Sequence, residues 1–297
     1  MAIPFIRAFE PRHGERVQVT PTIARVVANN PGPFTFTGTG VYIVGTKDVA
    51  VIDPGPDLPE HVEALKRALN GRRVTHILVT HTHADHSPAA KPLKEWSGAK
   101  TYGFGPHGSG RDAASEDGGP KVEAGGDMDF APDVRVKDGD ILAGDGFTFE
   151  CVHTPGHTSN HMCFALAEEK ALFTGDHVMG WSTTVVTPPD GDMAAYIASV
   201  EKLQRRGDRT LYPTHGAPVS DPQPFLAAYR EHRLDRERQV LASIAVGRDT
   251  IPAMVAHMYA DVDARLHPAA SRSVLAHLIK LEREGRVIRD DARYRLS

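Results

Sequence analysis

The sequence is poor in cysteine, with only Cys151 and Cys163 among its 297 residues. Two cysteines cannot make the multi-bridge framework that stabilises small secreted domains, and neither has a spacing typical of metal ligands. Long hydrophobic runs are also lacking. No window has the length of a transmembrane helix, and residues 1–7 are too short and interrupted to form the apolar segment of a signal peptide. We therefore expect no membrane association and a cytoplasmic location.

A strong charge of either sign is absent too. The formal net charge is −4, which provides no general field for attracting nucleic acid or an anionic membrane. The hydrophobic fraction of 40% is ordinary for a globular protein and allows a sizeable core. Because the chain is longer than a typical single domain, we expect one large domain and one small domain.

Short β-branched runs alternate with helices and turns over the first two-thirds of the chain. This mixture includes hairpins, and it favours an α/β sandwich over a purely parallel, doubly wound sheet. The predicted strands cover 41–44, 49–53, 74–79, 146–153, 161–167, 170–174 and 209–212, and the predicted helices cover 57–70, 88–96 and 193–205.

The last quarter of the chain is helical in character. Helices are predicted over 225–246, from about 252 and over 271–284, followed by a hairpin over 286–296. Helices followed by a two-stranded wing suggest a winged helix. We therefore predict a catalytic domain over 1–220 and a helical, winged-helix-like domain over 221–297. The oligomeric state stays open, because the charged helix near 225–246 suits a partner as well as a bridge between domains.

The run HTHADH at 81–86 directly follows the predicted strand 74–79. Three imidazoles and a carboxylate in one turn would build a poor core, whereas zinc accepts this mixture of nitrogen and oxygen ligands. His81 and His83 alternate and can converge on one metal ion, while Asp85 and His86 turn towards a second. The alternative is a histidine-rich loop without a role.

Three more candidate ligands follow predicted strands further along the chain. They are His157 in PGH, Asp176 in TGD and His215 in PTH, each with a Gly or Pro beside it. Rigid strands would therefore deliver all seven side chains to one edge, where loops can carry a site.

With Asp53 in VIDPG, these motifs resemble the metallo-β-lactamase fold superfamily over about residues 20–220, in the family's order. The resemblance implies an αββα sandwich with two metal ions, expected to be zinc, although manganese and iron accept the same ligands. It implies one ion on His81, His83 and His157, a second on Asp85, His86 and His215, and Asp176 bridging them. Asp53 would orient these ligands through hydrogen bonds.

Two metal ions that share a water molecule lower its pKa towards neutrality, so that a bridging hydroxide can attack a carbonyl carbon or phosphorus. Asp85 is the candidate catalytic residue, since its second oxygen can orient the nucleophile and accept its proton. Such a site predicts a metal-dependent hydrolase. The acid that protonates the leaving group stays unassigned.

Several residues near these motifs are not expected to bind metal. His76 and His153 are expected to pack or to support a ligand, and His107 to be a solvated loop residue. Trp181 follows Asp176 closely, so it either lines a substrate pocket or anchors packing. The Gly-rich segment 105–131 is either a disordered surface loop or a lid.

Within the superfamily, PGHT at 155–158, GDH at 175–177 and the winged-helix pattern resemble the β-lactamase-like protein 2 family. That resemblance implies an endoribonuclease acting on single-stranded RNA, with arginines at 283, 286, 289, 293 and 295 near phosphates. The HTHADH run is also similar to glyoxalase II, so the alternative substrate is a small thioester, lactone or β-lactam. A third hypothesis is a winged-helix, nucleic-acid-binding regulator with a vestigial metal site.

Overall fold

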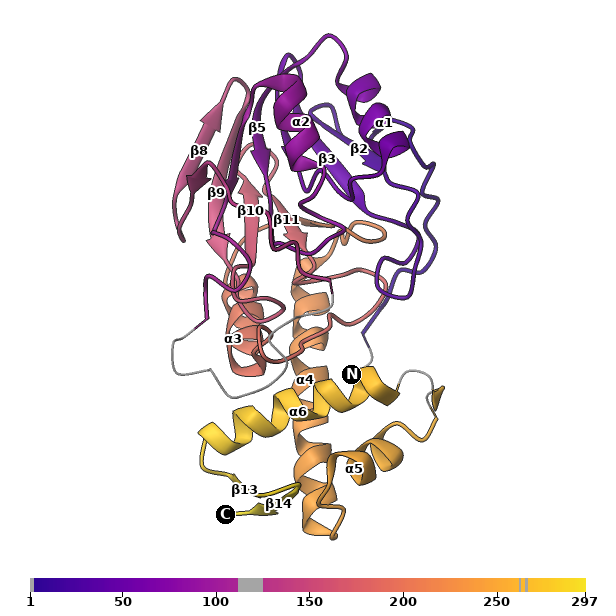
Figure 1. Ribbon diagram of the computed structural model, residues 1–297, viewed down its shortest axis with the longest axis vertical. Helices are drawn as coiled ribbons and strands as arrows, with labels where there is room; N and C mark the ends of the chain where they lie inside the picture. Colours follow the sequence, from indigo (N-terminus) through magenta and orange to yellow (C-terminus); the bar gives the residue numbers. More distant parts are fainter. Residues whose placement is uncertain (1–2, 112–124, 262, 265–266) are drawn as a thin grey trace.

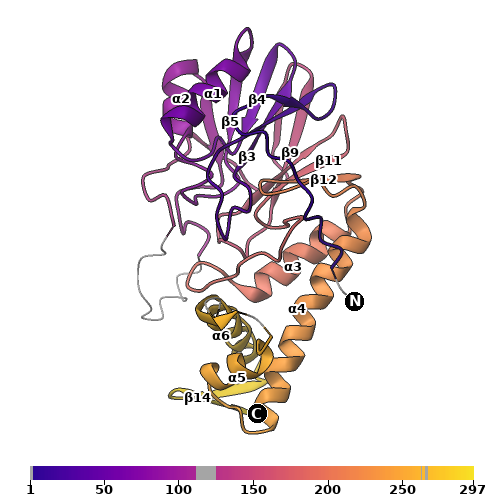
Figure 2. The same ribbon diagram turned by 90° about the vertical axis from the view of Figure 1, so that its right-hand side faces the viewer.

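The computed structural model describes residues 3–111, 125–261, 263–264 and 267–297. Figure 1 shows an α/β part above a smaller helical part. The long helix α4 (Pro222–Ala245) runs from one part into the other, as the turned view in Figure 2 makes clear. The predicted charged helix therefore bridges the two parts of the chain. No helix within the described residues is both long and apolar enough to span a bilayer.

The first sheet has seven strands whose spatial order equals their order in the sequence. They are β1 (Val17–Gln18), β2 (Ile23–Val27), β3 (Gly40–Gly45), β4 (Asp48–Ile52), β5 (Arg73–Leu78), β6 (Lys100–Gly103) and β7 (Val134–Arg135). The pairs from β1 to β4 are antiparallel, and those from β4 to β7 are parallel. Two crossover helices, α1 (Pro59–Leu69) and α2 (Ala90–Ser97), make the first two parallel connections.

The second sheet has five strands in the order β12-β11-β10-β9-β8. They are β8 (Ile141–Gly144), β9 (Phe147–His153), β10 (Met162–Leu166), β11 (Ala171–Gly175) and β12 (Thr210–Pro213). Neighbouring strands from β8 to β11 form antiparallel pairs, while β11 and β12 are parallel and connected through α3 (Met193–Gln204).

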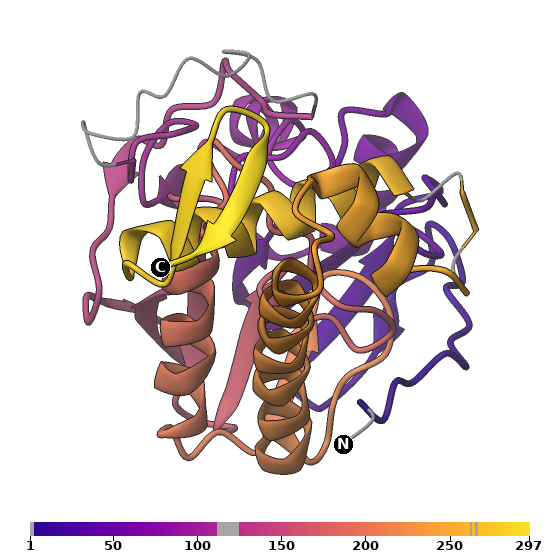
Figure 3. The ribbon, with the colours of Figure 1, turned by 90° about the horizontal axis from the view of Figure 1, so that it is seen from below.

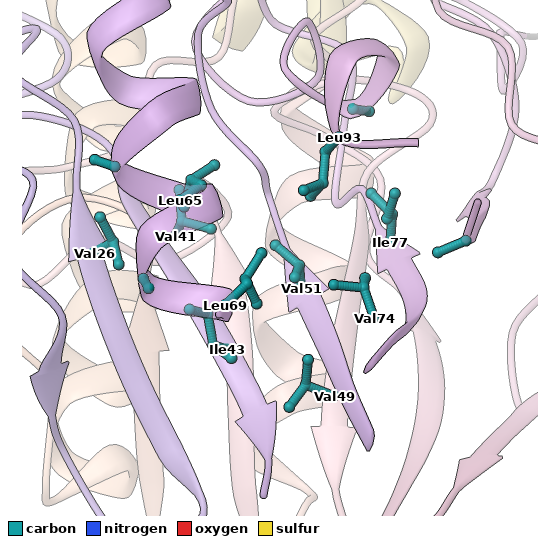
Figure 4. Packing of buried hydrophobic residues seen from close by; sticks show 14 of the residues in the cluster. Val26, Val41, Ile43, Val49, Val51, Leu65, Leu69, Val74, Ile77 and Leu93 are labelled. Atoms are coloured by element: carbon teal, nitrogen blue, oxygen red, sulfur yellow. The ribbon is translucent and has the colours of Figure 1, made fainter. Parts of the chain in front are cut away.

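The hydrophobic residues divide into layers because successive side chains of a strand face opposite sides. In β3, Val41 and Ile43 pack with Leu65 and Leu69 of α1 on the outer face of the first sheet (Figure 4). The residue between them, Tyr42, packs between the sheets with the phenylalanines of the second sheet. Helices α3 and α4 cover the outer face of that second sheet. The predicted αββα sandwich is confirmed.

The C-terminal part surrounds the end of α4, where Val240 and Ile244 share one core with the following elements. Those elements are α5 (Ile251–Met258), α6 (His267–Arg283), β13 (Val287–Asp290) and β14 (Arg293–Leu296). The view from below in Figure 3 shows the β13–β14 hairpin lying against the helices. The predicted helices and the two-stranded wing are present.

Five short strands, β1, β2, β6, β7 and β8, were not predicted. Strand β2 is buried throughout although Arg25 interrupts its apolar run, because the guanidinium of Arg25 lies over the ring of Phe9 at 4.3 Å. Tertiary packing thus overrides the local pattern. The predicted glycine-rich segment 105–131 is described only at its two ends, and its residues 112–124 lie outside the described residues.

Candidate metal centre

The turn after β5 places the HTHADH run at the edge of the sandwich. The backbone N–H of Thr80 donates to Asp53 Oδ1 at 2.8 Å, which ties the end of β5 to the end of β4. His81 and His86 are buried, while His83 and Asp85 are partly exposed. The turn therefore begins inside the protein and opens towards solvent.

His157 reaches the same place from the loop between β9 and β10. Gly156 before it has a φ of +135°, and a Cβ at this position would lie 2.3 Å from Tyr196 Cα in α3. Only glycine fits both the conformation and the close approach. The PGH sequence thus packs this loop tightly against α3 and aims the imidazole at the HTHADH turn.

One group of donor atoms comes from His81, His83 and His157. The Nδ1 atom of His83 lies 2.8 Å from His81 Nε2 and 3.1 Å from His157 Nε2. The three ring nitrogens all lie within 4.8 Å of one another. Nitrogens gathered this closely suit a shared metal ion, since lone pairs converge on one point.

A second group comes from Asp85, His86 and His215. The Oδ2 atom of Asp85 lies 3.1 Å from His215 Nε2 and 3.4 Å from His86 Nε2. These three atoms also lie within 4.8 Å of one another. Both imidazoles are fully buried, so their positions are set by packing rather than by solvent.

Asp176, directly after β11, lies between the two groups. Its Oδ1 is 3.3 Å from His215 Nε2 and 3.6 Å from His86 Nε2, while Oδ2 is 3.8 Å from His157 Nε2. One carboxylate therefore presents one oxygen to each group. This is the arrangement expected of a bridging ligand.

The second ring nitrogen of four histidines is held by a hydrogen bond. Such bonds fix the tautomer and the orientation of a metal-binding imidazole. The pairs are His81 Nδ1 with Thr80 Oγ1 (3.1 Å), His86 Nδ1 with Asp53 Oδ2 (2.9 Å), His157 Nδ1 with Val185 O (2.6 Å) and His215 Nδ1 with Gly38 O (3.1 Å).

Asp53 is the most connected of the supporting residues, and its side chain is fully buried. Besides the bonds from Thr80 N and His86, its Oδ2 accepts hydrogen bonds from the hydroxyls of Thr80 and Thr214, each at 2.8 Å. Its φ of +48° is uncommon outside glycine, although aspartate tolerates it. The structure places Asp53 where it can orient the ends of β5 and β12 together.

The polar atoms at the centre of the cluster fit a metal ion. His86 Nε2, His215 Nε2 and Asp176 Oδ1 are buried and have no hydrogen-bond partner within the described residues. A buried polar atom without a partner is costly, and an ion that accepts these lone pairs removes that cost. Five imidazoles and two carboxylates suit zinc, manganese or iron.

The local charges also favour a cation. Burial, together with the neighbouring His86 and His83, holds the pKa of His81 well below its ordinary value and keeps its ring neutral. Burial alone would lower the pKa of His86, but the carboxylates of Asp85, Asp176 and Asp53 raise it well above that value. The carboxylates therefore attract positive charge, which a bound metal ion would supply in place of the proton.

The other histidines considered in the sequence do not belong to this cluster. His76 stacks on Tyr102 at 4.9 Å, and His153 stacks on Phe104 at 4.2 Å. The expectation of a solvated His107 is wrong, because this residue is half-buried and its Nδ1 lies 2.9 Å from Thr82 Oγ1. The hydroxyl of Thr82, within the HTHADH run, supplies a contact that the isolated loop sequence does not reveal.

Trp181 lies beside the cluster and stacks on Phe36, with ring centroids 4.7 Å apart and planes 11° from parallel. A Cβ on Gly216, next to His215, would lie 3.3 Å from Trp181 Cδ1. Sequence analysis missed Phe36, along with the carbonyls of Gly38 and Val185 that hold two of the candidate ligands. Backbone carbonyls leave no side-chain signal, but the NPGP turn before Phe36 marks the loop that carries two of these groups.

An αββα sandwich with clustered histidines and aspartates at one edge defines a class, and comparison with known proteins identifies the family. The Metallo-beta-lactamase superfamily model matches residues 35–215, and the Beta-lactamase associated winged helix domain model matches residues 250–295. The chain belongs to the metallo-beta-lactamase superfamily and carries its associated winged-helix domain. The resemblance inferred from the motifs is thus confirmed.

The similar proteins include one relative and two solved structures of particular use. An atrochrysone carboxyl ACP thioesterase from Aspergillus chevalieri is 35% identical over 234 residues, which cover 78% of this chain and 68% of the relative. The metallo-beta-lactamase family protein TTHA1429 from Thermus thermophilus has a TM-score of 0.75 at 24% identity, covering 94% of this chain and 100% of that one. TTHA1623 in a di-iron-bound form has a TM-score of 0.52 at 27% identity, covering 70% and 98%.

Proposed function

We propose that this protein is a dinuclear metal-dependent hydrolase that cleaves a thioester. The observation that carries the proposal is the position of Asp176, which offers one oxygen to each of two three-residue donor groups. The similarity to a protein named as an acyl-carrier-protein thioesterase supports the choice of bond. It favours the thioester alternative over the RNA substrate suggested by the motifs.

The residues that would hold the ions are those of the two groups. His81, His83 and His157 would bind one ion, Asp85, His86 and His215 the other, and Asp176 both. We propose zinc, and the related TTHA1623 in its di-iron form supports iron as the competing choice. When bound, the two ions supply the positive charge that acidifies a water molecule and stabilises the charge developing on a substrate oxygen.

The side chain of Asp85 would orient the attacking water and accept its proton. The Oδ2 atom of Asp85 faces His86 and His215, which leaves Oδ1 to accept a hydrogen bond from the attacking water and then its proton. The water oxygen forms a bond to the carbonyl carbon, and the carbon–sulfur bond breaks, giving a carboxylic acid and a thiolate. The carboxylic acid then loses the second proton of the water to solvent, and Asp85 releases the first. Because a thiol has a pKa of about 8–9, the thiolate leaves without a strong acid beside it. This agrees with a site in which no leaving-group acid is assigned.

Three of the five arginines on which the RNA hypothesis depends are paired with carboxylates within the protein. Arg286 lies 2.8 Å from Glu237, Arg293 lies 2.8 Å from Asp249, and Arg283 pairs with Asp192. Cations that are already paired with carboxylates contribute less to binding phosphates, since each pair must open first. The aromatic pair of Phe36 and Trp181 beside His215 instead suits an apolar acyl group.

A hydrolysis panel tests the proposal. The zinc-loaded protein is incubated separately with an acyl-coenzyme A thioester, a lactone, a β-lactam and single-stranded RNA, with thiol release and RNA cleavage as readouts. We expect thiol release that depends weakly on salt. RNA cleavage that falls steeply with salt, without thiol release, would contradict the thioester assignment and restore the RNA hypothesis. No hydrolysis of any substrate by a metal-loaded protein would leave the regulator hypothesis as the better explanation.

A further inference from the structure

Residues 176–185 form an irregular segment that touches the metal centre at both ends. Asp176 lies between the two donor groups, and the carbonyl of Val185 accepts a hydrogen bond from His157 Nδ1 at 2.6 Å. No helix or strand covers this segment, so its backbone is held by contacts from elsewhere. The groups that hold it therefore influence two candidate ligands at once.

Helix α4 supplies these contacts. The hydroxyl of Tyr229 lies 2.7 Å from Met179 O and 3.1 Å from Met179 N. One turn further along α4, Arg233 Nη2 donates to the carbonyl of Thr184. Because α4 begins at Pro222, both residues lie beyond the 35–215 match to the superfamily model.

Thr184 connects the hydrogen bond from Arg233 to the backbone of the metal centre. Its hydroxyl lies 2.8 Å from Asp176 O and 3.0 Å from His177 O. Thr184 also directly precedes Val185, whose carbonyl holds His157. A shift of Thr184 would therefore move the backbone behind Asp176 and the acceptor behind His157 together.

Arg233 is an unusual residue for this position. It is only 4% exposed, its guanidinium lies 5.0 Å from the centre of the Tyr196 ring, and its Nε has no hydrogen-bond partner within the described residues. A buried guanidinium is costly, and an apolar residue of similar volume is often more favourable for stability. Stability alone therefore gives a weak reason for an arginine here.

We propose that Arg233 is a positioning residue of the metal centre, which acts through Thr184 on Asp176 and His157. The inference rests on the proposed metal-dependent function, because the property it affects is metal binding. Residues that orient metal ligands typically change metal affinity by about 10- to 100-fold when they are replaced. We expect an effect of that size, with little change in the metal-free fold.

The test compares Arg233→Met with a matched control on the same helix. Methionine keeps the aliphatic packing on Tyr196 and removes the donor to Thr184. Arg236 provides the control, because its guanidinium also lies over a tyrosine, Tyr259 at 4.5 Å, and donates to a backbone carbonyl, Met258 O at 3.3 Å, away from the metal centre. Zinc affinity is measured by competition with a chromogenic chelator, and melting temperature is measured with and without zinc.

We expect Arg233→Met to weaken zinc binding about 10- to 100-fold. It should also narrow the difference in melting temperature between the zinc-loaded and metal-free protein, with Arg236→Met behaving like the parent. Thr184→Val, which removes only the hydroxyl, should reproduce the loss, and Arg233→Lys should recover part of it. Adding Thr184→Val to Arg233→Met should then cost little more, since both act along one route.

Two results would overturn the inference while leaving the proposed function intact. One is an Arg233→Met protein that binds zinc with the affinity of the parent, or whose melting temperature falls below that of the parent by the same amount with zinc and without it. The other is a Thr184→Val protein with parental affinity, which would exclude the route through Thr184. A parent protein that binds no zinc, manganese or iron would instead overturn the proposed function and this inference together.

Discussion

Asp53 Oδ2 accepts a hydrogen bond from His86 Nδ1 at 2.9 Å, and both side chains are fully buried. The carboxylate belongs to the end of β4, and the imidazole belongs to the turn after β5. The same oxygen accepts a hydrogen bond from Thr214, beside His215 at the end of β12. One buried carboxylate thus joins strands from both sheets behind the candidate metal centre, without belonging to either donor group.

Asp53→Asn should therefore weaken both the fold and metal binding. The asparagine side chain has an NH₂ donor in place of one carboxylate oxygen, and the carboxylate of Asp53 only accepts hydrogen bonds. We therefore expect the free energy of unfolding to fall by about 1–3 kcal/mol. Zinc affinity should fall by about 10- to 100-fold, because His86 loses its orienting partner. Urea unfolding and chelator competition measure the two effects. Asp48→Asn is the control, since Asp48 pairs with the exposed Arg73 and should change stability far less than Asp53→Asn does. Equal effects of the two substitutions would contradict the role of Asp53.

Removal of metal should abolish hydrolysis and lower the melting temperature. The inward-facing atoms of His86, His215 and Asp176 are buried and have no well-aligned hydrogen bond within the described residues, so the metal-free site satisfies them less well than a bound ion would. At a metal concentration about 100 times the dissociation constant, binding adds about 2.7 kcal/mol to stability. Differential scanning calorimetry after chelation and after return of zinc measures this. Unchanged melting and full activity after chelation would refute metal dependence.

Asp85→Asn should separate binding from proton transfer. The amide keeps an oxygen that can face His86 and His215, but it no longer accepts a proton from water. We expect kcat to fall by about 10²- to 10⁴-fold, the usual contribution of a general base. His83→Ala should instead lose metal from the first group, measured by metal analysis of the purified protein. Full turnover by a metal-depleted His83→Ala protein would contradict the whole scheme.

His277 should make stability depend on pH. Burial, followed by the nearby cations Arg233 and Lys280, lowers its pKa to about 3; His232 and Arg236 contribute as well. The unfolded chain takes up this proton near pH 6.5, but the folded protein does not do so until about pH 3. The unfolded state therefore binds more protons between these values, and stability falls as pH falls from 6.5 towards 3, by up to about 1.4 kcal/mol per pH unit.

His277→Leu removes the titrating group from α6 and should flatten this dependence. Urea unfolding of the parent and the variant at about pH 7, 6 and 5 measures the difference. The two proteins should diverge as pH falls, with the variant losing less stability. Parallel curves would show that His277 does not contribute to the pH dependence.

The candidate ligands were accessible to sequence analysis because the motifs that carry them are local. His81 to His86 occupy one turn after a strand, so their spacing alone brings them together. His157, Asp176 and His215 each follow a strand as well, and these strand ends meet at one edge of the sandwich. Boundaries were close for the same reason: the predicted strand 146–153 is observed as β9, Phe147–His153.

The groups that orient those candidate ligands could not be predicted from the sequence in the same way. Val185 and Gly38 act through carbonyl oxygens, which every residue has, so no residue type marks them. Arg233 sits in the charged helix predicted over 225–246, yet its guanidinium is buried against Tyr196. Such a position depends on how α4 crosses α3, which no local pattern encodes.

The amino-acid sequence by itself determined the sandwich, the winged helix and the chemical identity of the seven candidate ligands, since periodicity and strand-end motifs are local properties. Only the tertiary structure decided how those ligands are oriented. Asp53 reaches Thr214 across 161 positions of the sequence, and Arg233 reaches Thr184 across 49. The fold also decided that three C-terminal arginines are paired with carboxylates from other elements. Contacts of this kind follow from packing between distant segments, which no local pattern of residues encodes.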